Sequence, residues 1–400
     1  MLFLPAFFHV RGGIVNTGIN TTNQTSGPIE VKPVLTGTDL SVFINLPWQI
    51  YKDDPNWVPP LKLERRLHFS RLNPYFKNAE WQAWVAYRAG KPVGRICAQI
   101  DQVNRQHHGQ HTGHFGLLEA VNEFDVFAAL TRASENWLAN RQSTHISGPF
   151  SFSINQECGI LVDGFDTPPV ILMPHSRQWY SSLLEQQGYK PAMDMLAYWI
   201  ETDFEASRVM KTLVARFDKR IRLRTLRRKR FREEMEILRE IFNDAWSDNW
   251  GFIPFSKEEF AELGNSLRLF IPDDYVQIAE LDGQPVAFVV VLPNLNEILA
   301  RLDGKLLPFG WLQLYRGTKQ NSCSTGRVPL MGVRKQYQNS SLGLTLALMV
   351  CNAARNSAHA MGIKAVEMSW ILENNKGMRS ILDNIGSKEY KRYRIYEKNL

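Results

Sequence analysis

The chain has 400 residues, too many for one ordinary hydrophobic core, so about two domains are expected. Hydrophobic residues make up 44% and charged residues 22%, a balance that excludes a wholly disordered chain. The formal net charge of +7 favours an anionic partner, such as a phosphorylated cofactor, an anionic membrane surface or nucleic acid. The cysteines form no CxxC pair, so neither a zinc site nor a redox dithiol is indicated and no metal site is expected, and their small number fits a reducing, cytoplasmic compartment.

Residues 1–28 are expected to form a flexible tail. The apolar run from Met1 to Phe8 has no basic residue before it and no cleavage site after it, so it does not match a signal peptide. The stretch from Asn16 to Gly27 is rich in Asn, Thr, Gly and Ser, which is typical of a flexible segment. Because later apolar runs fall well short of the ~20 residues that span a bilayer, any membrane contact is expected at the surface.

Residues 29–202 alternate between strand and helix patterns. In chain order we expect a strand over Ile29–Leu35, a helix capped by Asp39 that kinks or ends at Pro47, a hairpin of Trp81–Tyr87 with Pro92–Ile100, a strand over His114–Ala120, a helix over Val126–Asn140, and strands over His145–Pro149 and Met193–Ile200. A linking helix is expected within residues 203–219.

Residues 220–400 repeat this order of elements. The patterns predict a strand over Ile221–Leu226, a helix over Phe231–Trp246, a hairpin of Tyr275–Leu281 with Pro285–Leu292, a strand over Arg327–Val333, a helix over Ser341–Met361, a strand over Lys364–Trp370, a helix over Asn375–Ile385 and a strand over Tyr390–Tyr396. The order of elements recurs although residue identity between the halves is poor. We therefore predict an α/β protein with a mixed sheet and two similar halves in tandem.

The loop after the strand over Arg327–Val333 carries the strongest functional signal. Small and polar residues, Gln338-Asn339-Ser340-Ser341-Leu342-Gly343, lead into a helix that is apolar on nearly every side. The first turn of a helix has unpaired N–H groups and a partial positive charge, which together suit a pyrophosphate. A buried helix that is merely capped by Ser341 is the alternative.

This loop resembles motif A of the GNAT superfamily of CoA-dependent N-acyltransferases, whose pattern is R/Q-x-x-G-x-G/A. Gln338 takes the first position, Ser341 replaces the first Gly and Gly343 matches the last. The resemblance covers roughly Ile221 to Leu400 and implies acyl-CoA or acetyl-CoA as co-substrate. By that resemblance the cofactor-binding residues are Met331, Gly332, Val333, Gln338, Asn339, Ser340, Ser341, Leu342, Gly343 and Asn375.

The resemblance leaves the catalytic residues open. Many GNAT enzymes carry a general-acid Tyr at the position that Leu382 occupies here, so Tyr390 is a candidate substitute. An amine must lose a proton as it attacks a thioester, which makes Glu367 and Glu280 candidate bases. The alternative is that both glutamates are solvent-facing strand residues and that Tyr390 is a core aromatic.

The first half lacks such a loop. In its place, Glu123 and Asp125 precede a helix, and their carboxylates would repel a pyrophosphate, so this degenerate GNAT-like half is expected to shape the acceptor site instead. The long irregular stretch from Gly148 to His175 is rich in Gly, Pro and aromatic residues, and such loops often carry function. Its candidate substrate-binding residues are Asn155, Glu157 and His175, and a packed structural lid is the alternative.

Together with Pro47-Trp48, Tyr51, Asp54-Pro55 and Trp57-Val58-Pro59-Pro60, this stretch resembles a bacterial group of two-domain GNAT-like proteins that includes bacterial ceramide synthases. The resemblance implies transfer of an acyl group from acyl-CoA to a small-molecule or lipid amine, such as a sphingoid amine. The departures at Ser341 and Leu382 leave an alternative, a non-catalytic scaffold that binds a lipid or a protein.

Four histidines, His107, His108, His111 and His114, lie close in sequence. Two glycines interrupt them and no cysteine is near, so we expect a polar loop rather than a metal site.

Residues Lys219–Arg232 are densely basic, which would suit peripheral contact with an anionic membrane, here the inner membrane. Phe231 is the single aromatic residue of the run, too few to stack bases, so no nucleic acid partner is expected. The alternative is a strand and turn whose charge is compensated by Glu233, Glu234 and Glu236.

Overall fold

The structure is a computed structural model that describes residues 27–203, 212, 215, 220–268 and 272–400. Apart from a few residues at their edges, the expected tail over residues 1–28 and the expected linking helix over residues 203–219 lie outside these ranges.

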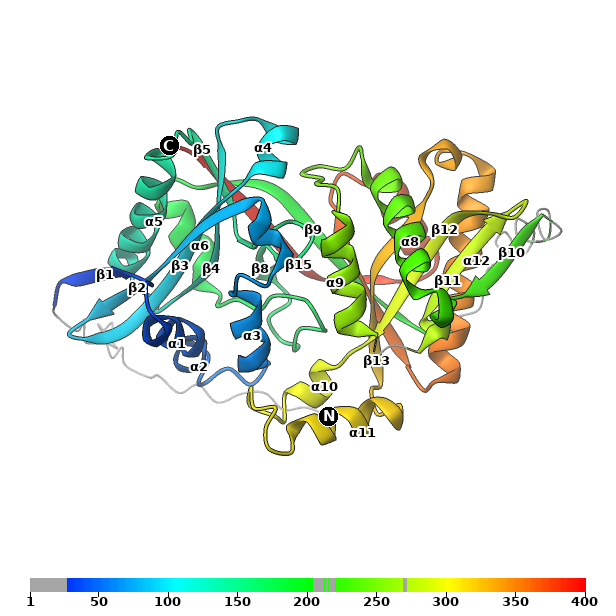
Figure 1. The fold of residues 1–400 in the computed structure, drawn as a ribbon, viewed down its shortest axis with the longest axis horizontal. Helices are drawn as coiled ribbons and strands as arrows, with labels where there is room; N and C mark the ends of the chain where they lie inside the picture. Colours follow the sequence, from blue (N-terminus) through cyan, green and yellow to red (C-terminus); the bar gives the residue numbers. More distant parts are fainter. Residues whose placement is uncertain (1–26, 204–211, 213–214, 216–219, 269–271) are drawn as a thin grey trace, which may run out of the picture.

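One sheet runs through both halves of the described chain (Figure 1). Its strands follow the order β1-β2-β3-β4-β5-β15-β9-β14-β13-β12-β11-β10, and β8 pairs with β15 beside this path. The first half contributes β1 (Ile29–Pro33), β2 (Ala79–Arg88), β3 (Lys91–Asp101), β4 (Thr112–Ala120), β5 (His145–Gly148), β8 (Ile160–Asp163) and β9 (Lys190–Glu201). The second contributes β10 (Ile221–Thr225), β11 (Val276–Leu281), β12 (Gln284–Pro293), β13 (Thr325–Val333), β14 (Ala365–Leu372) and β15 (Lys388–Asn399).

The two halves have the same strand order when each is followed inward from its end of the sheet. The reason is that each half places its last strand beside the other half. β9, the last strand of the first half, pairs with β14 of the second, and β15, the last strand of the chain, pairs with β5 of the first. β4 with β5 and β13 with β14 are the parallel pairs. The exchange joins the halves through the middle of the sheet, so a site at β14 is built partly by the first half.

Helices cover both faces of each half. The first half contains α1 (Gly37–Asn45), α2 (Pro47–Ile50), α3 (Lys62–His68), η1 (Pro74–Lys77), α4 (Gln102–His108), α5 (Phe124–Ala139) and α6 (Trp179–Gln186). The second contains η2 (Arg228–Arg230), α8 (Phe231–Trp246), α9 (Lys257–Leu267), η3 (Asp273–Tyr275), α10 (Asn296–Leu299), α11 (Gly310–Lys319), η4 (Lys335–Tyr337), α12 (Ser341–Ala360) and α13 (Lys376–Asn384). α8 and α9 pack on one face of β11–β13 and α12 on the other, each over its own buried apolar cluster (Figure 1).

The predicted strands and helices of the described residues are present, with ends that shift by a few residues. Three local predictions were wrong. Thr36, not Asp39, caps α1, and Asp39 completes the capping box from the third helical position. Ser340, not Ser341, caps α12. His107 and His108 end helix α4, which the following glycine terminates, and do not lie in a loop. No described helix is long and apolar enough to cross a membrane.

Candidate active site

Strands β13 and β14 separate partway along their length. Their parallel pairing runs from Thr325 opposite Ala365 to Val328 opposite Met368 and is not found beyond that point among the described residues. There β14 shifts its register against β9, between Met368 and Ile371. The divergence leaves part of β13 without a strand neighbour on one side, where side chains of Trp246 and Gln338 donate to the carbonyl oxygens of Met331 and Val333.

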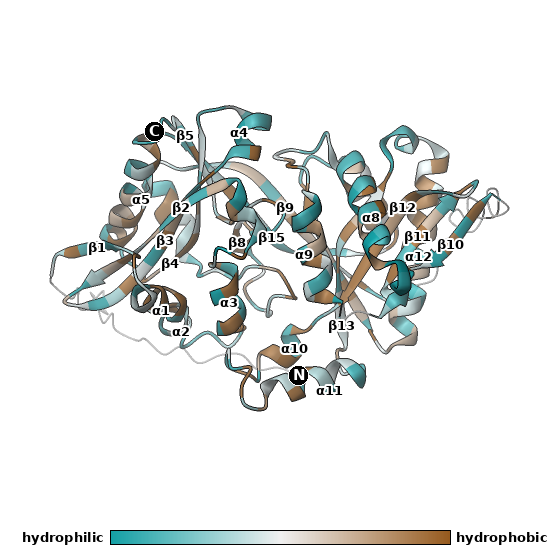
Figure 2. Ribbon diagram, viewed as in Figure 1, coloured by the Kyte–Doolittle hydropathy of each residue, from teal (hydrophilic) through white to brown (hydrophobic). Residues whose placement is uncertain are grey.

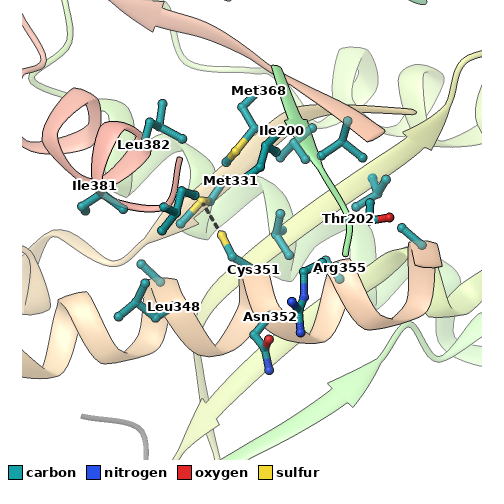
Figure 3. A pocket seen from close by; sticks show the side chains of 18 of the residues that line it. Ile200, Thr202, Met331, Leu348, Cys351, Asn352, Arg355, Met368, Ile381 and Leu382 are labelled. Carbon is teal, nitrogen blue, oxygen red and sulfur yellow. Dashed lines mark hydrogen bonds between the residues drawn. The ribbon is translucent and has the colours of Figure 1, made fainter. Parts of the chain in front are cut away.

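A narrow apolar crevice lies on the α12 side of this divergence (Figure 3). Its volume is about 70 Å³, and its lining includes Met331, Cys351, Met368 and Leu382. Leu382, at the position where the resemblance implies a Tyr, is fully buried and packs with Leu196 and Tyr198 of β9. The crevice therefore offers apolar contacts and sulfur atoms rather than a proton donor at residue 382.

The loop before α12 is held firmly by its own side chains. The Gln338 amide nitrogen donates to the carbonyl oxygens of Ala245, at 2.9 Å, and Val333, at 2.8 Å, which ties the loop to α8 and β13. The Ser340 hydroxyl oxygen accepts from the N–H of Gly343 at 3.0 Å. Asn339 takes a positive φ of 58°. The start of α12 is thus fixed in place.

Gly343 is required where it stands, because a Cβ there would overlap the carbonyl oxygen of Tyr337. Ser341, which replaces a motif Gly, is exposed on the first turn, so its hydroxyl does not obstruct the helix end. Asn375 caps α13, and its side-chain oxygen accepts from the N–H of Met378 at 3.1 Å. The starts of α12 and α13, which were both expected to bind the cofactor, are therefore ordered by capping side chains. The small residues at the start of α12 leave room for a phosphate.

A much larger cavity of about 710 Å³ lies on the opposite face, between the two halves. Its walls are mainly apolar and come from α8, α9, β12 and β13 on one side and from α3 and residues 151–157 on the other. The wall from the second half includes Met235, Leu238, Phe242, Trp246, Phe255 and Phe260. Among its polar lining residues are Arg65, His68, Asn155, Glu157 and Arg327.

Arg327 connects the cavity to a buried polar cluster. Its side chain donates to the Ser369 hydroxyl at 3.0 Å and to the Leu172 carbonyl oxygen at 3.0 Å, and its Nε lies 3.9 Å from Glu367 Oε1. Glu367 accepts hydrogen bonds from the hydroxyls of Ser369 and Tyr390. Two of the three predicted catalytic residues, Glu367 and Tyr390, are therefore in contact.

Glu367 is fully buried, so the alternative of a solvent-facing residue is wrong. Burial raises its pKa, although Arg327 and the two hydroxyl donors act in the opposite direction. Burial and the adjacent Glu367 raise the pKa of the Tyr390 hydroxyl well above its usual range. Neither side chain lines the cavity; Arg327 does.

Glu280, the third predicted catalytic residue, lies apart from this cluster on β11. It is buried, which again excludes a solvent-facing position, and it pairs with Arg224 at 2.5 Å and with Arg227 at 3.3 Å. Further pairs neutralise the same basic stretch: Arg224 with Glu234, Arg228 with Asp273 and Arg230 with Glu233. In the described part of Lys219–Arg232, most of the strip's charge is thus compensated within the chain.

Two of the three predicted substrate-binding residues, Asn155 and Glu157, line the cavity. Glu157 accepts from Arg65 at 2.9 Å, and the Asn155 amide donates to the Ile253 carbonyl oxygen at 3.0 Å. Burial opposes ionisation of Glu157, but the cationic neighbours, Arg65 first among them, together outweigh burial and lower the pKa of that carboxyl. His175 is directed elsewhere, to Asp54 at 3.0 Å, and does not line the cavity.

His68, which no motif or spacing in the sequence marks, is the residue that sequence reasoning missed. Its ring lines the cavity and stacks on Phe152, with ring centroids 5.0 Å apart. Its Nε2 is buried and has no hydrogen-bond partner among the residues that the structure describes. Burial lowers the pKa of His68 to about 3, so the imidazole is neutral near pH 7. A buried ring nitrogen without a partner, on a residue that lines a cavity, calls for an explanation such as a bound group.

The first half fills the equivalent divergence with its own chain. β4 pairs with β5 only from Thr112 to His114, and Phe150 then occupies the gap, so closely that a Cβ on Gly116 would overlap the Phe150 carbonyl oxygen. The carboxylates of Glu123 and Asp125, before and within α5, pair with Arg88 at 2.8 and 2.5 Å. Neither the gap nor the helix start of this half has room or charge for a pyrophosphate.

Comparison with known proteins gives full-length relatives. The chain is 49% identical over 383 residues to Protein YghO of Escherichia coli strain K12, covering 96% of this chain and 98% of that protein. It is 43% identical over 381 residues to the bacterial ceramide synthase of Caulobacter vibrioides, covering 94% and 99%. No protein-family model matches.

Solved structures share the fold at low sequence identity. A tandem GNAT protein from the clavulanic acid biosynthesis pathway superposes with a TM-score of 0.54 at 14% identity, over 93% of this chain and 98% of that one. A GCN5-related N-acetyltransferase from Sphaerobacter thermophilus gives 0.51 at 14% identity, over 94% and 97%. The predicted fold of two GNAT-like halves in tandem is thereby confirmed.

Proposed function

The chain belongs to the family of E. coli Protein YghO and the bacterial ceramide synthase of C. vibrioides, and on this premise we propose that it is an N-acyltransferase that moves an acyl group from acyl-CoA to a lipid amine. One observation carries the proposal: the apolar cavity of about 710 Å³ is lined by Arg327, which lies one residue before the end of the pairing between β13 and β14. Donor and acceptor would meet at this point.

Acyl-CoA is proposed to bind on the second half alone. The first turn of α12 would hold the pyrophosphate with the backbone N–H groups of Ser341 and Leu342, because the Ser340 hydroxyl already accepts from the N–H of Gly343. The part of β13 from Met331 to Val333 would hold the pantetheine arm, and Asn375 lies on the neighbouring helix start. When bound, the thioester supplies the activated acyl group.

The size and chemistry of the cavity favour a long-chain amine, such as a sphingoid amine. Small-molecule sites usually enclose about 300 to 1,000 Å³, and this cavity lies well within that range. Each methylene group buried against apolar walls contributes about 0.8 kcal/mol, so a long tail gains affinity that a short amine cannot reach. The walls of α8 and α9 would take the tail.

The polar residues contributed by the first half would hold the amine end of the acceptor. The ionised Glu157 carboxylate attracts an ammonium group, and the free Nε2 of His68 accepts a hydrogen bond from a hydroxyl or a neutral amine. Asn155 fixes this loop to the second half through Ile253. His175 is not included, because it contacts Asp54 instead.

The proposed reaction is a direct attack of the amine nitrogen on the thioester carbon. The new C–N bond forms as the C–S bond breaks, the nitrogen loses one proton, and the CoA sulfur takes one up. Backbone N–H groups of β13 would polarise the thioester oxygen, and the rate would come mainly from positioning. Glu367 and Tyr390 would act through Arg327, which they orient, rather than by touching the substrate.

Turnover measurements test the proposal. The purified chain is incubated with palmitoyl-CoA or acetyl-CoA and with long-chain or short amines, while thiol release and the N-acyl product are followed. We expect product with the long-chain amines and little with the short ones. A folded protein that releases no thiol with any pair would overturn the proposal. Lipid binding by calorimetry without turnover would instead favour the non-catalytic scaffold.

A further inference from the structure

Large apolar side chains are exposed in two segments of this protein, at residues 62–72 and 301–319. Leu72, Leu307 and Phe309 are 80%, 71% and 70% exposed, and Leu63, Leu67, Trp311 and Tyr315 are about half exposed. Seven of the ten exposed large hydrophobic residues in the described chain belong to these segments, so they are concentrated rather than scattered. We call these seven residues the apolar rim.

The two segments adjoin each other. The N–H of Lys62 donates to the Gly304 carbonyl oxygen at 3.0 Å, and the Trp48 indole N–H donates to Asp303 at 2.8 Å. Figure 1 places α3, α10 and α11 along one edge of the molecule, and Figure 2 shows hydrophobic residues on all three. Trp311 and Tyr315 are four residues apart and share one face of α11, while Leu314 anchors that helix in the core.

The charge around the apolar rim is strongly positive. Residues 62–72 and 301–319 contain eight basic residues and two acidic ones, Glu64 and Asp303. Arg316 and Lys319 follow the exposed aromatics on α11, and neither forms an ion pair within the described chain. Exposed aromatic and leucine side chains beside cations without an ion pair in the described chain match the interface of an anionic bilayer.

The apolar rim is continuous with the mouth of the large cavity. Leu67 and Leu72 belong to both, since each is exposed and each lines the cavity. We propose that the apolar rim docks on the surface of an anionic lipid bilayer, so that the cavity opens towards the membrane. The proposal concerns this surface and does not depend on turnover, although it explains how a membrane-held amine would reach the site.

Binding to vesicles tests the docking surface directly. The full-length chain is co-sedimented with vesicles of phosphatidylcholine alone and with vesicles that contain phosphatidylglycerol as well. We expect the wild type to bind the anionic vesicles. Binding should be at least about tenfold weaker for F309S/W311S, which removes apolar contact with the bilayer, and for R316E/K319E, which removes attraction to its negative charge. Phe124→Ser, at an exposed aromatic residue on α5, should bind like the wild type.

The second control separates this surface from the basic strip. Lys229→Glu with Arg232→Glu changes two exposed cations of that strip and should leave vesicle binding intact. Loss of binding in that variant with no loss in F309S/W311S would overturn the proposal. The proposal would also be overturned if the wild-type chain does not bind anionic vesicles, or if sedimentation velocity shows that it dimerises through the apolar rim instead. Circular dichroism and thermal unfolding confirm that each variant is folded.

Discussion

Arg327 and Glu367 lie directly opposite each other in the last paired part of β13 and β14, with Arg327 Nε and Glu367 Oε1 3.9 Å apart. The equivalent register in the first half places His114 opposite Ser147, where the His114 Nδ1 and the Ser147 hydroxyl are 3.0 Å apart. At equivalent positions the second half thus has an ion pair and the first half a neutral hydrogen bond. The gap between the diverging strands is open in the second half and filled by the chain itself in the first.

Arg327→Gln should strongly destabilise the fold. The substitution leaves the fully buried Glu367 carboxylate without its cation, and breaking a buried pair costs about 3 to 5 kcal/mol. The double variant R327Q/E367Q should recover much of that loss, because no buried charge remains. Urea unfolding of the wild type, R327Q, E367Q and the double variant measures both effects. If the losses of stability in the two single variants simply add in the double variant, the pairing is contradicted.

Gly343→Ala should weaken acyl-CoA binding by at least about tenfold. The added Cβ meets the Tyr337 carbonyl oxygen, so the loop must shift the N–H groups at the start of α12. Gly37→Ala is the matched control, because a Cβ at Gly37 meets no atom within 4 Å. Calorimetric titration with palmitoyl-CoA gives both affinities, and equal values would remove this helix start from the binding site.

Sequence patterns predicted most elements of the second half because each pattern lies within the helix or strand that it predicts. Helix α8 begins and ends where the periodicity of Met235, Leu238, Ile241 and Phe242 places it. The exchange of β9 and β15 could not be predicted in this way, since a strand's own residues do not specify which half it joins. The burial of Glu367 follows from that exchange, because Trp199 of β9 lies opposite it.

The candidate site was predictable only in part for the same reason. The small residues that follow β13 and precede an apolar run marked the start of α12, although the cap fell one residue earlier, at Ser340. Glu157 and His175 share one irregular loop, yet tertiary contacts direct the first to the cavity and the second to Asp54. His68 acquires its role from Phe152 and Arg65, which pack around it only in the folded chain.

His68→Phe should raise the KM for an amine that carries hydroxyl groups and spare that for a plain alkyl amine. Phenylalanine keeps the stacking on Phe152 but removes the free Nε2 acceptor. Loss of one hydrogen bond of about 1 to 1.5 kcal/mol corresponds to a roughly five- to tenfold change. His107→Phe, on α4, is the control. An equal change with both amines would show that the ring serves packing instead.

His114→Gln should make the fold less sensitive to mild acid. Burial, with the nearby His145, lowers the pKa of His114 to about 3 in the folded chain, whereas an unfolded His titrates at about 6.5. Between these values the unfolded chain binds the extra proton, so this group's contribution to stability is lost as the pH falls below about 6.5.

At pH 5 that loss is about 2 kcal/mol for His114, and it disappears when the imidazole is replaced. The fall in the thermal midpoint from pH 7 to pH 5 should therefore be smaller in the variant than in the wild type, even if the variant is less stable at pH 7 for want of the Ser147 contact. Parallel pH curves for His114→Gln and the wild type would mean that the His114 ring is protonated in the fold and that its environment accepts the charge.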